Sequence, residues 1–264
     1  MSEPRDITPI GLPSRIGFLR LLQLASPALP VGAFAYSQGL EAAITCGHVT
    51  DERTASLWIS GLLTDVLAYQ DLALFVRLHA AAVVGDRAAL RRWNDFLFAT
   101  RGAAELQTED RHLGGALARV LNTLGVSSLF DDSVATTATT TTTATARAVT
   151  ATATATATAT TTPSPPITFA AHFACASATW GIDVATAAEA FAFTWAESQT
   201  SAAVRAVPLG QSAGVRILAG AADVIPKAVA VAMSLTDDEL GASAPNQALL
   251  SIEHETQYSR LFRS

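Results

Sequence analysis

Cys46 and His48 stand close together in the sequence and are suited to bind a transition-metal ion. Thiolate and imidazole groups are among the ligands that such metals prefer. A closed site takes about four ligands, however, and this pair supplies only part of that set. The alternative is a free thiol near a helix end beside a surface histidine, which needs no metal. A dimer would bring together two such pairs, so a metal carrier that uses Cys46 and His48 stays open as one hypothesis.

The spacing of the other histidines predicts neither a metal site nor a catalytic site. No two of the 5 histidines are four residues apart, so no helix face carries two of them one turn apart. The phosphate-binding pattern GxxxxGK[ST] is absent from the sequence. An enzyme with a site around Glu197, His172 and His254 is a further hypothesis, but no spacing joins these side chains. The sequence therefore predicts a protein that is not an enzyme and holds no cofactor of its own.

Charge and cysteine content restrict the partners and the compartment. The net charge of -6 argues against a nucleic-acid binder, which needs a basic surface to release counterions from phosphates. Cys46 and Cys175 are far apart, and no secretory segment opens the chain, so we expect free thiols in the cytoplasm. The longest uncharged stretch, 148–182, is mostly Thr, Ala and Pro, and its apolar part is shorter than the ~20 residues of a membrane span. We therefore expect neither a nucleic acid nor a membrane as a partner.

The elements that must position these side chains are predicted to be helices. Asp51 is a typical N-cap. The apolar residues that follow it recur at helical spacings and predict one buried face: Leu57, Trp58, Leu62, Val66 and Tyr69. Further helices are predicted from Asp71 onward and across 184–207. The pattern is typical of an all-α fold, with a flexible N-terminal arm at 1–15 and a single domain of roughly ten helices at 16–264.

Residues 131–162 consist almost entirely of Thr and Ala and interrupt the helical domain. Alternating Thr suits a strand by propensity, but the tract has no large apolar face to bury. Such a segment cannot recover the entropy that it loses on ordering. We interpret it as a disordered low-complexity insertion, with a marginal extended segment as the alternative.

The segment 23–41 reads QLASPALPVGAFAYSQGLE and forms an apolar stretch with almost no charge. Pro27 and Pro30 fix φ and remove backbone donors, so this part of the chain cannot continue a helix. Phe34 and Tyr36 offer large contact areas. Two interpretations are open: a buried turn between helices, or a surface that a partner covers.

The segment 252–264 reads IEHETQYSRLFRS and places Tyr258, Leu261 and Phe262 among arginines. Protein interfaces are enriched in aromatic residues and arginine. We therefore predict that 252–264 is a partner-binding tail. The alternative is a final helix docked on its own domain.

Three long and unusual stretches are the segment 23–41, VPLGQSAGVRIL at 207–218 and HETQYSRLFRS at 254–264. Together they resemble the urease accessory protein F family. The resemblance covers nearly all of 16–264 apart from the Thr/Ala tract, where the family has a short connection.

This resemblance implies an all-helical, cytosolic, dimeric and non-catalytic protein that acts in the maturation of the nickel enzyme urease. Members of the family bridge accessory protein D, called H in some organisms, and the GTPase accessory protein G. The GTPase binds GTP and carries nickel, and the assembly docks on apo-urease and supports GTP-dependent nickel insertion. In the family, the tail becomes ordered against accessory protein D together with the proline-containing segment.

Matching the motifs residue by residue gives a set expected to face accessory protein D or H: Tyr36, Gln38, Tyr258, Arg260, Leu261, Phe262 and Arg263. Gln199, Arg205 and Gln211 lie in matching segments, and the resemblance assigns them no role. The alternative function is a nickel carrier that uses Cys46 and His48.

Overall fold

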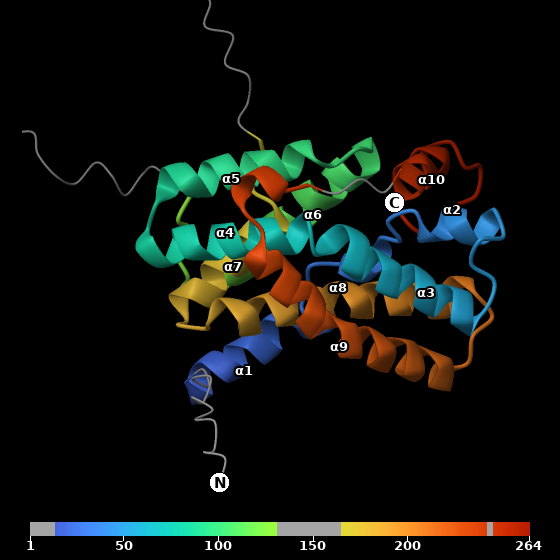
Figure 1. Cartoon of the computed structure of the whole chain (residues 1–264), viewed down its shortest axis with the longest axis horizontal. Helices are drawn as coiled ribbons and strands as arrows, with labels where there is room; N and C mark the ends of the chain where they lie inside the picture. Colours follow the sequence, from blue (N-terminus) through green and yellow to red (C-terminus); the bar gives the residue numbers. More distant parts are fainter. Residues whose placement is uncertain (1–13, 131–164, 242–244) are drawn as a thin grey trace, which may run out of the picture.

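The computed structural model describes residues 14–130, 165–241 and 245–264. Within these ranges the chain forms ten α-helices and no strand, which confirms the predicted all-α fold (Figure 1). The helices are α1 (Arg15–Leu24), α2 (Leu40–Thr45), α3 (Glu52–Leu62), α4 (Asp71–Val84), α5 (Arg87–Ala99), α6 (Ala104–Thr123), α7 (Phe169–Thr179), α8 (Val184–Ala206), α9 (Gln211–Ser234) and α10 (Pro245–Glu255). Most of the arm expected at 1–15 and the insertion expected at 131–162 lie outside the described residues.

Several helices begin where the sequence supplies a side chain that caps them. The Asp51 carboxylate accepts a hydrogen bond from the Thr54 N–H at 2.7 Å, and the Asp51 N–H donates to the Thr54 hydroxyl at 3.0 Å. This reciprocal pair satisfies backbone groups that the first turn of α3 leaves without helical partners. Asp86, Thr168 and Asp183 each accept from the N–H three residues later and start α5, α7 and α8. The capping role predicted for Asp51 is confirmed.

The buried face of α3 differs from the predicted one. Ala55, Ile59 and Leu62 are buried, whereas Leu57 is 60% exposed and Tyr69 is 37% exposed, so the predicted burial of these two residues is wrong. Leu57 lies on the opposite side of the helix from the smaller Ala55 and the branched Ile59. Beyond Leu62 the helix continues as a π-helical turn, Leu63–Leu67, which widens the turn and changes which side faces the core.

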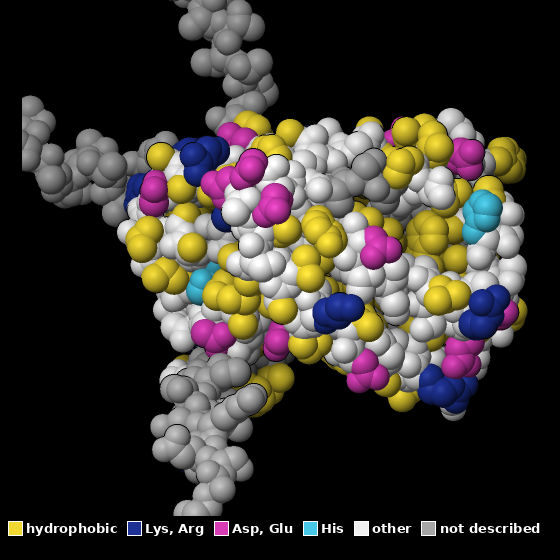
Figure 2. All heavy atoms as spheres, in the orientation of Figure 1, with side chains coloured by type: hydrophobic (Ala, Val, Ile, Leu, Met, Phe, Trp, Pro, Cys, Tyr) yellow, Lys and Arg dark blue, Asp and Glu magenta, His cyan; other side chains and the backbone are white. Residues whose placement is uncertain are grey.

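Large apolar side chains reach the surface at several places. On the face shown in Figure 2, hydrophobic side chains lie between scattered acidic and basic groups. Only 15% of the residues are charged, whereas about a quarter is usual. The most exposed of the large apolar side chains include Ile16, Val83, Val84, Val215 and Tyr258. The surface therefore offers apolar contact area to partners.

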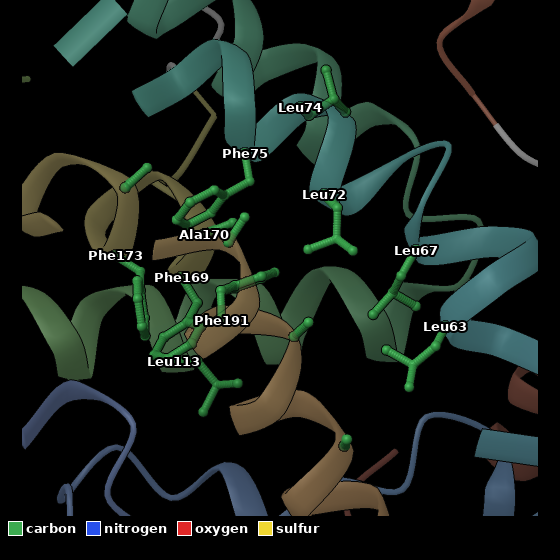
Figure 3. Close-up of a cluster of buried hydrophobic side chains, with 14 of the residues drawn as sticks. Leu63, Leu67, Leu72, Leu74, Phe75, Leu113, Phe169, Ala170, Phe173 and Phe191 are labelled. Atoms are coloured by element: carbon green, nitrogen blue, oxygen red, sulfur yellow. The ribbon is translucent and has the colours of Figure 1, made fainter. Parts of the chain in front are cut away.

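The core lies between α4, α7 and α8. The Phe75 ring of α4 packs against Phe173 of α7 and Phe191 of α8, with ring centroids 5.9 Å and 5.0 Å apart (Figure 3). Phe169 joins this group at 6.0 Å from Phe173. Such aromatic pairs add about 0.5–1.5 kcal/mol each beyond the burial of their area. Helix α4 also contacts α5 and α9, and α9 lies along α8 (Figure 1). Most of the other helices therefore pack against α4 or α8.

Among the described residues, α9 alone is long and apolar enough as a single helix to cross a membrane by length and composition. Its most apolar window has a mean hydropathy of 1.6, and α3 with its π-helical turn passes the same test only jointly with α4 across a 50° bend. The buried side of α9, which includes Ile217, Ala221 and Ile225, packs against α3, α4 and α8. Core helices of globular proteins meet the same criterion, so the expected absence of a membrane partner stays a prediction.

Gly114 of α6 gives a sharp test of how α6 packs against the start of α7. A Cβ atom at Gly114 would lie 2.1 Å from the Ile167 carbonyl oxygen, which is backbone and cannot swing away. We expect Gly114→Ala to lower the free energy of unfolding by about 2 kcal/mol or more, measured by urea denaturation. Gly115→Ala is the matched control, because its nearest neighbour would be the flexible Arg119 side chain at 3.8 Å. This control should gain about 0.5–1 kcal/mol from helix propensity, and equal effects of the two substitutions would contradict the packing.

Candidate functional site

The segment 23–41 leaves α1 at Leu24, forms a 3-10 turn at Ala33–Ala35 and enters α2 at Leu40. Gly32 and Gly39 have φ angles of 80° and 86°, which lie in the left-handed region that glycine adopts without a Cβ clash. The two glycines therefore let the chain reverse sharply on each side of Phe34 and Tyr36.

Gln38 is the one non-glycine residue with positive φ (52°) in the described part of the chain. Such a conformation costs about 1 kcal/mol or more for a residue with a Cβ atom. Two side-chain hydrogen bonds hold it in place. Gln38 Nε2 donates to Glu109 Oε1 at 2.8 Å, and Trp195 Nε1 donates to Gln38 Oε1 at 2.7 Å. Gln38 thereby connects the loop to α6 and α8.

The chain after α10, residues 256–264, packs onto this loop. These residues are called the tail from here on. The N–H groups of Ser37 and Gln38 donate to the Ser264 backbone oxygen at 2.6 Å and 3.1 Å, and the Ser37 hydroxyl donates to the same oxygen. The Arg263 N–H donates to the Ala35 carbonyl at 2.9 Å. The C terminus consequently lies at the end of the molecule formed by α2 and α10 (Figure 1).

Glu41 of α2 is a buried carboxylate that accepts hydrogen bonds from the tail. The Leu261 N–H donates to Oε1 at 2.7 Å, and the Phe262 N–H donates to Oε2 at 2.9 Å. His254 Nε2 lies 3.0 Å from the same Oε2 atom. One side chain of α2 therefore fixes both the backbone of the tail and the end of α10.

His254 is fully buried between two carboxylates. Its Nε2 faces Glu41 at 3.0 Å and its Nδ1 faces Glu105 Oε2 at 2.7 Å. Arg260 Nη1 donates to the other Glu105 oxygen at 2.7 Å. Two acidic groups thus meet two basic groups where the tail leaves α10.

Arg205 of α8 connects the loop and the tail from the other side. Its Nη2 atom donates to the Phe34 carbonyl, and its guanidinium carbon lies 4.5 Å from the centre of the Phe262 ring. This geometry is a cation–π contact. The resemblance assigned Arg205 no role, and the structure places it in the loop–tail contact.

The residues expected to face a partner divide into exposed and buried groups. The exposed members are Tyr258, Arg260, Leu261 and Arg263, and Gln38 is half-buried. Tyr36 is only 3% exposed and its hydroxyl lies 2.9 Å from His112 Nδ1, while Phe262 is 4% exposed. In this structure Tyr36 and Phe262 lie buried beneath the exposed members of the set. The tail is docked on its own domain, which is the alternative that the sequence left open.

The sequence analysis did not single out four residues that hold α10 and the tail in place: Ser37, Glu41, Glu105 and Glu109. A signal was available for Glu41, because it is the one charged residue in an otherwise uncharged loop segment. A charge in such surroundings is buried only with a partner.

Cys46 and His48 are exposed at the end of α2. The Cys46 Sγ atom lies 3.7 Å from Glu253 Oε2. The described residues contain no group of three or more His, Cys, Asp or Glu side chains placed to hold a metal ion. The pair therefore remains a partial ligand set in one chain.

The residues weighed as an enzyme site have different neighbours. His172 packs edge-on against Phe130, with ring centroids 6.0 Å apart, whereas His254 lies between Glu41 and Glu105. Residues 210–214, GQSAG, match the GxSxG pattern of a nucleophile elbow. Such an elbow follows a strand, whereas this segment opens α9 directly after α8, so Ser212 lacks the required context.

A sequence model of the UreF family matches residues 49–222. The chain belongs to the UreF family. It is 39% identical over 248 residues to a protein of Alkalilimnicola ehrlichii named urease accessory protein UreF, with 93% of this chain and 95% of that relative covered. A urease accessory protein UreF of Paracidovorax citrulli is 41% identical, with 97% of this chain and 92% of the relative covered. A bifunctional urease accessory protein UreEF of Bordetella bronchiseptica is 40% identical over 92% of this chain, which spans 51% of the fused protein.

In this member of the UreF family, the loop and the tail lie outside residues 49–222 and on either side of them in sequence. Glu105 and Arg205, which hold the tail, come from within the matched part. The site is thus assembled from both ends of the chain on the helices between them.

Glu109 of α6 lies where the loop, the tail and α6 meet. Its Oε2 atom accepts a hydrogen bond from the Ser264 hydroxyl at 3.2 Å. Burial raises the pKa of the Glu109 carboxyl to about 7, and the charge of Asp110 adds to the rise while the hydrogen bond from Gln38 opposes it.

Glu41→Gln should loosen the tail, because it removes a charged acceptor. The N–H groups of Leu261 and Phe262 donate to that carboxylate, and His254 faces it. Hydrogen bonds to a charged group contribute about 1.5–3 kcal/mol, so amide exchange in the tail should accelerate roughly tenfold or more. Hydrogen–deuterium exchange of the C-terminal peptide measures this effect. Glu52→Gln, which breaks the exposed ion pair with Arg216, is the control and should leave the tail protected. Unchanged exchange in the Glu41 variant would show that this carboxylate does not hold the tail.

Glu109 should make stability depend on pH. Its pKa is higher in the folded protein than the ordinary 4.5, so its stabilising contribution is present at low pH and is lost as the pH rises through about 7. Glu109→Gln should remove this loss, which amounts to about 1.4 kcal/mol for each unit of pKa difference. Urea unfolding at a series of pH values measures the slope, and Asp223→Asn at an exposed position of α9 is the control. Equal slopes in the wild type and the Glu109 variant would contradict the assignment.

Proposed function

We propose that this UreF-family protein is a non-catalytic, cytoplasmic scaffold for urease maturation. It bridges accessory protein D, or H, and the GTPase accessory protein G, and supports GTP-dependent nickel insertion into apo-urease. The observation that carries the proposal is the contact between the loop and the tail. The two segments that resemble the family's D-facing motifs pack on each other and form one composite surface.

The exposed side chains of this composite surface suit a protein interface. Tyr258 is fully exposed, Leu261 is 60% exposed and Phe34 is 55% exposed. Arg260 and Arg263 lie among them and are also exposed. Aromatic residues and arginine are the commonest hot spots of interfaces. The buried residues below hold the backbone in place, so the partner meets a surface whose ordering cost is small.

The proposal divides the chemistry among the chains of the complex. GTP is bound by accessory protein G, and nickel is handed on through the assembly, so this chain needs no phosphate-binding loop. Support for cooperation among accessory proteins comes from the relatives' names and from the fused UreEF of Bordetella bronchiseptica. A homodimer follows from the resemblance, and the apolar surface offers contact area for it.

Variants at exposed positions test the partner surface better than removal of the tail. Deleting the tail would also remove the buried Phe262 and uncover the core, so a loss of binding would have two explanations. Tyr258→Ala combined with Leu261→Ala should weaken the complex with accessory protein D or H by about tenfold or more, as expected for interface hot spots. Co-purification and titration of the tagged protein with both partners measure the affinity.

The control for this experiment is Val215→Ala combined with Val84→Ala, two exposed apolar positions on α9 and α4. Because both positions lie outside the loop–tail surface, this double variant should bind accessory protein D or H as the wild type does. Wild-type affinity in the Tyr258/Leu261 variant would refute the proposed surface. Tight stoichiometric nickel binding that is lost in Cys46→Ala would instead favour the nickel-carrier alternative.

A further inference from the structure

A small groove lies between the end of α1, the proline-containing loop and α8. Its apolar lining includes Leu24, Pro27, Leu29, Val31 and Phe34. The groove has a volume of about 50 Å³. Pockets that hold separate small molecules measure about 300–1,000 Å³, so this groove suits the end of one side chain from another protein.

Glu197 of α8 is the one charged residue among the described residues that line the groove. The side chain is half-buried and has neither a hydrogen bond nor an ion pair within the described ranges of the chain. Both carboxylate oxygens remain accessible to solvent, so an incoming group can reach them. Burial raises the pKa of Glu197. The carboxylate has thus lost part of its hydration without gaining a positive neighbour, and a cation in the groove would compensate it.

Two hydrogen bonds from α8 hold the loop side of the groove in place. The Ser198 hydroxyl donates to the Ala33 carbonyl at 3.0 Å, and Arg205 Nη2 donates to the Phe34 carbonyl. The groove is therefore formed before a partner arrives, and little ordering cost opposes its occupation.

The groove is continuous with the composite loop–tail surface. Phe34 belongs to both and is 55% exposed, so a partner that covers the composite surface also covers the groove. An arginine side chain matches the lining best, because its methylene stem packs on apolar walls while its planar guanidinium pairs with a carboxylate. A guanidinium is also more weakly hydrated than an ammonium and loses less on entering an apolar groove.

We propose that an arginine side chain of accessory protein D, or H, enters this groove and pairs with Glu197. Its stem contacts Leu29 and Phe34, and its guanidinium meets the carboxylate on α8. The inference rests on the proposed function, since it takes accessory protein D or H as the partner of the loop–tail surface. It adds the chemistry of one contact, namely a charge pair at the edge of an otherwise apolar surface.

Glu197→Gln tests the charge pair, because it keeps the size of the side chain and removes the charge. We expect this variant to bind accessory protein D or H about tenfold more weakly than the wild type, measured by calorimetric titration of the full-length protein. Glu189→Gln is the matched control. It lies on the same helix, is half-buried and has a pKa that burial raises, but it is not part of the groove lining. The control should bind as the wild type does.

Ser201→Arg tests the groove by filling it from within the chain. Ser201 is exposed, lines the groove and follows Glu197 by four residues on α8. A glutamate pairs well with an arginine four residues later on a helix, so the new side chain should occupy Glu197 and weaken the complex about tenfold. Ser201→Ala leaves the groove open and should bind as the wild type does. Circular dichroism and the urea midpoint verify that each variant is folded.

The outcomes separate this inference from the proposed function. Wild-type affinity in folded Glu197→Gln or folded Ser201→Arg overturns the inference alone when the Tyr258/Leu261 double variant still binds weakly. Equal weakening by Glu189→Gln also overturns it, because the effect would then come from the net charge of α8. If the wild type does not bind accessory protein D or H at all, the inference and the proposed function both fail.

Discussion

The loop–tail site depends on the hydrogen bonds that the buried carboxylate of Glu41 accepts. This carboxylate accepts hydrogen bonds from two backbone N–H groups of the tail and faces His254 of α10. A carboxylate in such surroundings is stable only when donors meet its oxygens. Because the donors come from α10 and from the chain after it, the loop, α10 and the tail form as one unit.

The buried polar groups around His254 specify geometry more than they add stability. Glu41 and Glu105 face His254, and Arg260 pairs with Glu105 at the edge of the cluster. Buried ion pairs lose much of their attraction to desolvation, but the loss of one partner leaves an uncompensated charge. The cluster therefore favours one position of the tail over others. A partner that covers Tyr258 and Leu261 would find this position already formed, whereas the family resemblance implied a tail that becomes ordered on binding.

Gln38 and Glu109 link the loop–tail site to a neighbouring cavity of about 280 Å³ between α6, α8 and α10. Both side chains line the cavity, and Glu109 also contacts Ser264 at the end of the tail. Trp195, which donates to Gln38, belongs to the aromatic side of the same cavity. The position of the tail and the shape of the cavity are thus set by the same hydrogen bonds.

The sequence by itself determined the helices and the family. Asp51 capped its helix as predicted, because a cap depends on groups three residues apart. The motifs at 23–41, 207–218 and 254–264 indicated the UreF family because they are long and unusual. The buried face of α3 was misjudged, because helical spacing cannot tell which of two apolar sides, Leu57 or Ile59, meets the core.

Only the tertiary structure decided how the site is built. His254 meets Glu105 and Glu41 across 149 and 213 residues of sequence, and no local pattern encodes such a contact. For the same reason the sequence could name Tyr36 and Phe262 as members of the site, but could not show that they are buried. Leu261 stays exposed while its backbone N–H donates to Glu41 of α2, and the next residue, Phe262, is buried; that arrangement follows from tertiary contacts and not from local sequence.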